Sequence, residues 1–142
     1  MVAEAAAELE RIPAPDRDAL EVLALRVAVL QEQQDWPALA SAAGEYARRA
    51  PDEAAAWVTF AYATRRGASL AAAEGILLEA ERLHPAEPTI QFNLGCYACQ
   101  RGDLAEARRR VDRAIALDQT FGVLANTDPD LAPLRAEGGR GA

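Results

Sequence analysis

Residues 93–118 have the sequence NLGCYACQRGDLAEARRRVDRAIALD, which contains the clearest helix signals of the chain. Apolar and small side chains recur at helical spacing on both sides of the Gly102-Asp103 pair. Gly102 can adopt the left-handed conformation that ends a helix, and Asp103 is a favoured cap residue for the start of the next helix. Glu106, three residues after Asp103, completes the pattern of a capping box. The stretch therefore predicts two helices joined by a short turn.

The same pattern recurs along the chain with a fixed period. Pro51 and Pro85 lie 34 residues apart, and Trp36, Leu70 and Leu104 form a second row with that spacing. A regular period of this length is the signature of a helical repeat array. The predicted units cover residues 20–53, 54–87 and 88–121.

Helix start and stop signals divide the first two units in the same way as the third. In the middle unit, Gly67 ends the first helix, Ser69 caps the second, and Pro85 stops the second because proline cannot continue the backbone ladder. In the first unit, Asp35 is the cap and Pro37 lies in the first turn of the following helix. Each unit is therefore expected to be a pair of helices.

These residues resemble the tetratricopeptide repeat family over residues 20–121, whose period is also 34 residues. The third unit carries the resemblance through Asn93-Leu94-Gly95, Gly102-Asp103-Leu104, Ala107, Val111, Ala114-Ile115 and Leu117-Asp118. The second carries it through Trp57, Phe60, Leu70, Ala73, Leu77, Ala80 and Pro85. The first unit departs from the pattern. The resemblance implies an all-α fold, a right-handed α-solenoid of helix-turn-helix repeats with terminal capping helices.

The chain has 142 residues, enough for one domain, and its two ends are expected to cap the array. The predicted N-terminal capping segment is 1–19, with a helix over 3–12 and Asp16 capping the first repeat helix. The predicted C-terminal capping helix is 122–137, with Asp128-Pro129 as its starting signal and Leu131 and Leu134 on its buried face. Residues 138–142 are expected to form a disordered tail.

Composition and charge exclude several classes of function. The net charge is −7, which repels phosphate backbones and anionic lipid surfaces, so neither nucleic acid nor membrane is an expected partner. No apolar stretch approaches the roughly 20 residues of a membrane span. Residues 1–10 show no secretory signal pattern, which predicts a cytoplasmic protein.

Residues that could carry catalysis are scarce. His84 is the only histidine, and its place before Pro85 is typical of a helix C-terminal cap. Cys96 and Cys99 form a C-x-x-C pair in the middle of a predicted helix, where small buried packing residues are the favoured interpretation over redox or metal chemistry. The arginines of 108–113 are interleaved with acids and are expected to form a solvated helix face. The sequence thus predicts no enzyme, no cofactor and no metal.

The family resemblance implies that the first helix of each unit lines a concave groove. The predicted groove residues are Thr59, Tyr62, Arg65, Arg66, Phe92, Asn93, Cys96 and Gln100. Aromatic rings offer rigid contact area, an asparagine can bond an extended backbone, and arginines suit a carboxylate. The alternative for Tyr62 and Phe92 is that each packs against a neighbouring helix.

The leading hypothesis is therefore a protein–protein interaction module, an adaptor or scaffold that binds a peptide or helix of a partner in the groove. An alternative is a self-associating scaffold, because Val22, Leu25 and Val29 add a second apolar face to the first repeat helix. Either the N-terminal helix or another copy of the chain would cover that face. A third hypothesis, a redox or metal-binding protein, rests on Cys96 and Cys99 alone.

Overall fold

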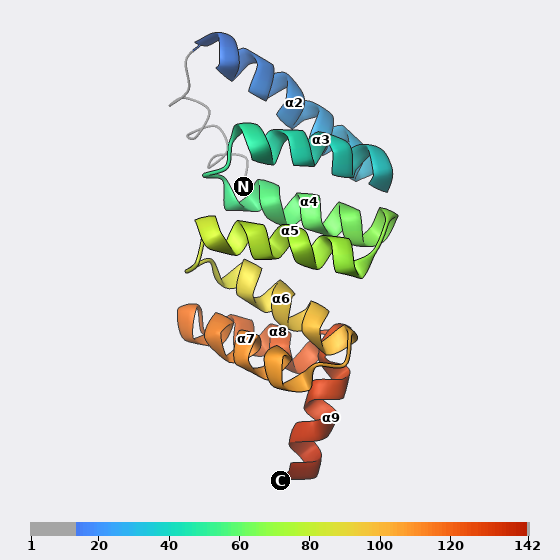
Figure 1. The fold of residues 1–142 in the computed structure, drawn as a ribbon, viewed down its shortest axis with the longest axis vertical. Coiled ribbons are helices and arrows are strands. Elements are labelled where there is room, and N and C mark those ends of the chain that lie inside the picture. The colour runs from blue at the N-terminus through green and yellow to red at the C-terminus, as the bar shows by residue number, and fades with distance from the viewer. Residues whose placement is uncertain (1–13, 142) are drawn as a thin grey trace. The chain divides into compact units, whose positions relative to one another are not determined.

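The structure is a computed structural model that describes residues 14–141 (Figure 1). The two helices of the first repeat are α2 (Ala14–Gln33) and α3 (Trp36–Arg49), and those of the second are α4 (Ala54–Gly67) and α5 (Leu70–Leu83). The third repeat contains α6 (Pro88–Gln100) and α7 (Leu104–Leu117). The chain then forms α8 (Phe121–Thr127), a short 3-10 helix η1 (Pro129–Leu131) and α9 (Ala132–Gly141). All six predicted repeat helices are present, and residues 14–141 contain no strand.

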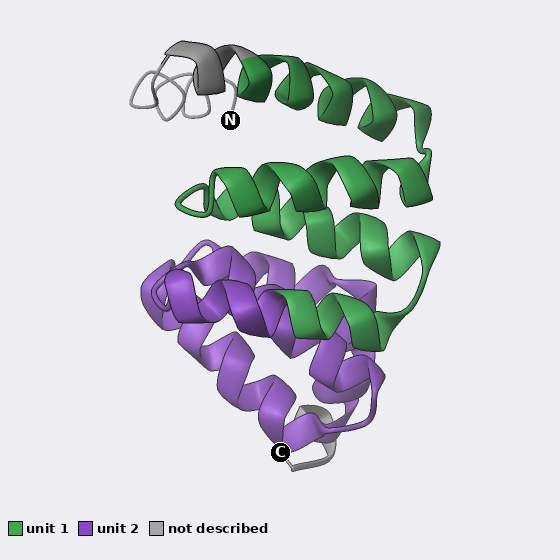
Figure 2. Ribbon diagram, turned by 45° about the horizontal axis from the view of Figure 1, so that its top comes forward, with its two compact units in different colours: residues 1–76 green, residues 77–142 purple. Residues whose placement is uncertain are grey.

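The chain divides into two compact units, residues 1–76 and 77–142, which Figure 2 shows in different colours. The described part of the first unit holds α2, α3, α4 and the start of α5. The second unit holds the rest of α5 and all the later helices. The boundary falls inside α5, and so within the second predicted repeat rather than between two repeats.

The core of the first unit lies between α2, α3 and α4. Leu39, Ala43 and Ala63 are fully buried there, and partly buried apolar side chains, Phe60 among them, pack around these three. A Cβ atom at Gly44 would lie 2.9 Å from the Phe60 ring, so this glycine lets α3 and α4 approach closely. The closely packed small residues expected from the sequence are therefore present.

The core of the second unit is built on the contact between α6 and α7. Leu94 and Val111 are buried, and the alanines 107 and 114 are fully enclosed. A Cβ atom at Gly95 would lie 2.8 Å from Cγ2 of Val111 and 3.3 Å from the carbonyl oxygen of Ala107. The backbone of α6 therefore rests directly on α7 at Gly95.

The predicted caps hold at three helix starts. Side chains of Asp35, Ser69 and Asp103 accept hydrogen bonds from backbone N–H groups three residues later, at 3.3, 3.1 and 3.1 Å. Gly102 has a φ of +89°, the left-handed conformation expected of it. At the corresponding turn of the first repeat, Gln34 takes a φ of 57° without being a glycine.

Only one of the two hydrogen bonds of the predicted capping box at Asp103 is present. Asp103 caps α7 as expected, but its own N–H donates to the carbonyl of Ala98 at 2.9 Å. The Glu106 carboxylate accepts instead from Arg109 and Arg110. Two guanidinium groups are stronger donors to a carboxylate than one backbone amide, and they direct the side chain along the helix.

Both predicted ends need correction. Helix α2 begins at Ala14, so Asp16 lies inside it and is not its cap, while the predicted helix over 3–12 lies outside the described residues. The predicted C-terminal helix 122–137 is interrupted at Asp128, whose side chain accepts from the N–H of Asp130 at 2.9 Å and starts η1. Helix α9 continues to Gly141 where a tail was expected. Leu131 and Leu134 are buried as predicted.

Candidate functional site

The predicted site residues of the first unit lie on α4. Tyr62 is 43% exposed and Arg66 is exposed, while Thr59 and Arg65 are half-buried. The Tyr62 ring meets the ring of Trp36 edge to face, with ring centroids 5.5 Å apart and an angle of 75° between the planes. Tyr62 therefore contacts a neighbouring helix and still presents a large part of its surface to solvent.

Arg66 lies against both of these rings. The centre of its guanidinium is 5.0 Å from the centroid of the Trp36 ring and 5.9 Å from that of Tyr62. Both distances are within the range of cation–π attraction. Trp36 was not among the predicted site residues, because its place in the 34-residue row indicated only a packing role.

Gly67 explains why these side chains meet. A Cβ atom at Gly67 would lie 3.1 Å from Cβ of Trp36 and 3.2 Å from the backbone nitrogen of Pro37. The end of α4 can therefore lie directly against the start of α3. We call the group formed by Trp36, Tyr62 and Arg66 the arginine–aromatic cluster.

The predicted site residues of the second unit lie on α6, and three of them contact the C-terminal segment of the chain. Phe92 is only 4% exposed and packs on Phe121 of α8, with ring centroids 5.3 Å apart. Cys96 is buried, and Nε2 of Gln100 donates to the carbonyl oxygen of Asp130 at 2.9 Å. Phe92 therefore packs against a neighbouring helix, which was the alternative to a place in the groove. Asn93 is half-buried.

Both cysteines of the C-x-x-C pair are buried in α6, and they are not joined in a disulfide. Cys96 lies near Asp128 and Asp130, and one potential ligand atom of each lies within 4.8 Å of the others. The Asp128 carboxylate already accepts the N–H of Asp130 as the cap of η1. This arrangement is accounted for by helix capping and packing.

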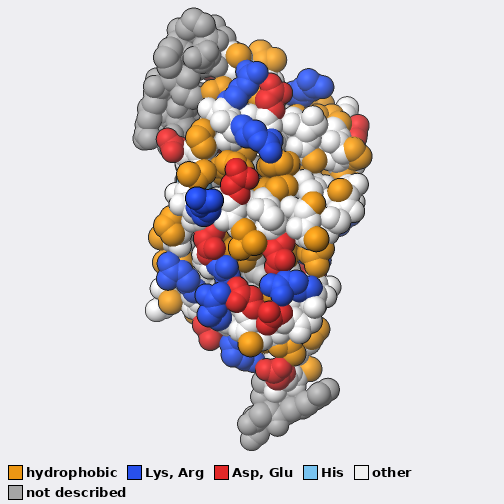
Figure 3. All heavy atoms as spheres, in the orientation of Figure 1, with side chains coloured by type: hydrophobic (Ala, Val, Ile, Leu, Met, Phe, Trp, Pro, Cys, Tyr) orange, Lys and Arg blue, Asp and Glu red, His pale blue; other side chains and the backbone are white. Residues whose placement is uncertain are grey.

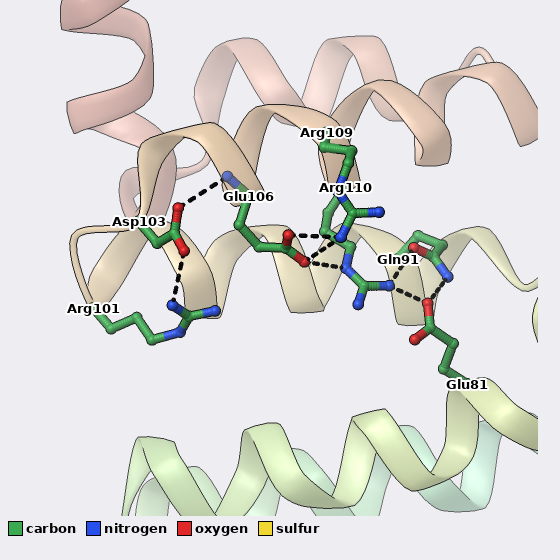
Figure 4. Close-up of polar contacts among 7 residues, drawn as sticks. All are labelled: Glu81, Gln91, Arg101, Asp103, Glu106, Arg109 and Arg110. Atoms are coloured by element: carbon green, nitrogen blue, oxygen red, sulfur yellow. Dashed lines mark hydrogen bonds and ion pairs between the residues drawn. The ribbon is translucent and has the colours of Figure 1, made fainter.

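A buried polar network lies in the second unit and was not predicted (Figure 4). Arg110 of α7 is 8% exposed and donates to Glu81 of α5, to Oε1 of Gln91 at 3.0 Å and to Oε1 of Glu106 at 2.8 Å. Gln91 is buried and its Nε2 donates to Oε2 of Glu81 at 2.6 Å. The network therefore links α5, α6 and α7.

The expectation of a solvated arginine face on α7 is wrong for Arg110. Its neighbours Arg109 and Arg113 are exposed, but Arg109 is paired with Glu106 and Arg113 donates to the carbonyl of Pro85. On the face shown in Figure 3, acidic and basic side chains are interspersed. The arginines of α7 thus form hydrogen bonds or ion pairs with other groups of the same chain.

Charge pairing sets the pKa values of the network. Burial raises the pKa of the Glu81 carboxyl, but hydrogen bonds from Arg110 and Gln91 outweigh it, and the net pKa is below the ordinary value. The hydrogen bond from Arg109 is the largest cause of the lowered pKa of Glu106, and Arg110 adds to it. Both carboxylates are therefore held in the charged form.

These shifts predict a loss of stability in acid. Because the two pKa values are lower in the folded than in the unfolded state, their contribution is complete above the unfolded value near 4.5 and is lost as pH falls through the folded values. We expect Glu81→Gln to lower the free energy of unfolding at pH 7 and to flatten its decline below about pH 4.5. Urea unfolding across pH measures this, with Glu79→Gln, an exposed neighbour, as control. An unchanged slope in Glu81→Gln would contradict the prediction.

No protein-family model matches the sequence, and no curated protein sequence matches it. Among solved structures, the chain is similar to the Yersinia enterocolitica type III secretion chaperone SycD, whose crystal structure contains a peptide of the translocator YopD. The TM-score is 0.73 at 16% sequence identity, and the match covers 88% of this chain and 96% of that one. The chain has a tetratricopeptide-like, all-helical fold. At this identity the likeness concerns the fold. No helix in the described part of the chain is long and apolar enough to cross a membrane.

Proposed function

We propose that the protein is an interaction module that binds a peptide segment of a partner protein on the exposed face of α4. The observation that carries the proposal is the arginine–aromatic cluster, where Tyr62 is 43% exposed and Arg66 lies over two rings. The structural neighbour SycD was crystallised with a peptide of another protein, which supports the same general role. Thr59 and Arg65 extend the proposed surface along α4.

The composition of this surface suits peptide binding. Tryptophan, tyrosine and arginine are the residues most enriched among those that dominate binding energy at protein interfaces, and the aromatic rings add large contact areas. A short peptide held by such a surface typically binds with micromolar affinity, about −8 kcal/mol. The proposed site does not include Asn93, which lies on α6 in the second unit. It no longer needs Phe92, Cys96 and Gln100, which contact α8 and η1.

The double variant Tyr62→Ala/Arg66→Glu is expected to weaken peptide binding by about 30-fold, the effect of losing one interface hot spot of about 2 kcal/mol. Peptides are first selected from a random displayed library against the wild-type protein, and their dissociation constants are then measured by fluorescence anisotropy. Arg49→Glu is the matched control, because Arg49 is exposed on α3 in the same unit and, among the described residues, pairs with Glu45 alone.

The control should bind like wild type, and thermal unfolding should show that all three proteins are folded. Selected peptides that bind the double variant as well as they bind wild type would show that the cluster is not the binding surface. A library that yields no peptide would contradict the proposed function itself.

Self-association is a second candidate, favoured by the outer face of α2. Val22 and Leu25 are each 68% exposed and Val29 is 52% exposed, while Leu20 and Leu23 on the inner face are buried. Three large apolar side chains in one row form the kind of patch that a second copy would cover.

The variant Val22→Glu/Leu25→Glu is expected to prevent self-association because it places two charges in that patch. Sedimentation equilibrium should give the wild type a mass above 15.2 kDa that rises with concentration, and the variant a constant mass of 15.2 kDa. Gln31→Glu, at an exposed position of the same helix, is the charge control. A wild type that remains at the monomer mass at all concentrations would eliminate this candidate.

A further inference from the structure

Arg66 differs from the arginines of α7 in the kind of partner it has. Its guanidinium contacts two aromatic rings, and among the described residues it makes no ion pair. A guanidinium carries its N–H donors in its plane and stacks on rings through its faces. The contacts with Trp36 and Tyr62 therefore hold the cation in place, and no carboxylate of the described residues pairs with its N–H donors.

We propose that the arginine–aromatic cluster recognises a single carboxylate, from an Asp or Glu side chain inside a partner peptide, flanked by apolar residues. This inference rests on the proposed function and names the chemistry of its ligand. A carboxylate matches the paired N–H donors of a guanidinium, and an arginine already held in place loses less conformational freedom on binding. Arg66 is the group that bonds the acid.

The two rings determine what lies beside the acid. Tyr62 is one turn before Arg66 on α4, whereas Trp36 belongs to a different helix, α3. Because the guanidinium lies over both rings, aromatic surface from two helices lies beside the cation. A peptide whose acid meets Arg66 can place the residue before the acid and the residue after it on these rings. An internal acidic residue fits this arrangement better than a chain terminus.

The charge of the whole protein limits the ligand to one acid. The net charge of −7 repels a peptide with a run of acidic residues, whereas a single carboxylate meets mainly the local field of Arg66. Additional acids in the peptide would increase this repulsion. The ligand is therefore an otherwise apolar or neutral segment with one acidic residue.

The test uses nine-residue peptides with acetylated and amidated ends in a serine–glycine background. The first has a central glutamate between two leucines, and the others replace the glutamate with glutamine, replace the leucines with serines, or carry four consecutive glutamates. A fifth ends in leucine with a free carboxylate. We expect the first peptide to bind about tenfold more tightly than its glutamine counterpart, and more tightly than the other three, in anisotropy titrations at low salt.

Variants assign the preference to the cluster. Arg66→Gln should bind the glutamate and glutamine peptides equally, whereas Arg49→Gln should keep the tenfold preference. Trp36→Leu leaves the charge of Arg66 in place but should reduce the preference for the glutamate peptide, because Arg66 then loses one of its two ring contacts. Leucine is chosen because Leu70 and Leu104 occupy the equivalent position of the other two repeats, and thermal unfolding checks that the variant is folded.

Three results would overturn the inference: equal binding of the glutamate and glutamine peptides to wild type, a preference that survives in Arg66→Gln, or a stronger preference for the free terminal carboxylate. If library-selected peptides still bind in a Tyr62-dependent way, the proposed function survives such a result. If neither selected nor designed peptides bind at about 1 mM, both are wrong.

Discussion

Replacing Arg110 with alanine is expected to lower the free energy of unfolding by about 3 kcal/mol. Arg110 is buried between Glu81, Gln91 and Glu106, so its loss removes a hydrogen-bond donor from two carboxylates and from a buried amide. The estimate is at the low end for a broken buried ion pair because both carboxylates retain partial access to water. Urea unfolding at pH 7 measures the change.

Arg109→Ala is the matched control for this prediction. Arg109 is the preceding residue of the same helix and also binds Glu106, but its side chain is 64% exposed. Exposed ion pairs of this kind contribute less than about 1 kcal/mol. Equal destabilisation by the two substitutions would show that the burial of Arg110 does not determine how much the network contributes to stability.

Replacing Gly95 with valine is expected to lower the free energy of unfolding by about 3 kcal/mol. A Cβ atom at this position already lies 2.8 Å from a methyl of Val111, and valine adds two more carbons where the α6 backbone rests on α7. Val111 is β-branched and cannot move aside by changing rotamer without strain. The expected result is a lower midpoint in urea or thermal unfolding.

Gly75→Val supplies the comparison, because a Cβ atom at Gly75 in α5 would have no atom within 4 Å apart from its own stretch of helix backbone. Valine and glycine differ little in helix propensity, so stability should change by less than about 0.5 kcal/mol. A similar loss at both positions would mean that the close approach at Gly95 does not limit side-chain size.

The repeat helices could be predicted from the sequence because their boundaries depend on local chemistry. The side chains of Asp35, Ser69 and Asp103 cap helices whatever the rest of the chain does, and Gly102 supplies the one left-handed residue that its turn needs. Helix α8 has no such signal. Thr120, before it, makes no side-chain cap bond, and seven residues are too few to show a helical period. For this reason, the packing of Phe92 against a neighbouring helix was predicted only as an alternative, and α8 was not identified as that helix.

The buried network was missed even though the sequence contained a signal for it. Gln91 shares a 34-residue row with Leu23 and Trp57, which are apolar and buried, so a polar side chain there needed a buried partner. Arg110 lies three and four residues from Ala107 and Ala114, on the packed side of α7. The partner itself, Glu81, comes from another helix, and this pairing depends on tertiary packing.

The arginine–aromatic cluster was only half predicted. Tyr62 and Arg66 were expected on the proposed surface from their repeat positions, but the partnership with Trp36 depends on how closely α3 and α4 approach at Gly67. Sequence spacing within one helix is fixed by its geometry, whereas the distance between two helices depends on the side chains at their contact.

The contact between α6 and α8 also affects how this protein can evolve. On α4, Tyr62 and Arg66 are exposed, so mutations there alter surface chemistry at little cost to stability. On α6, Phe92 and Cys96 lie under the C-terminal segment, and most mutations there would damage the core before changing any surface. Selection for a new partner would therefore act first on the N-terminal unit, while changes at Phe92 would be accepted mainly together with compensating changes at Phe121.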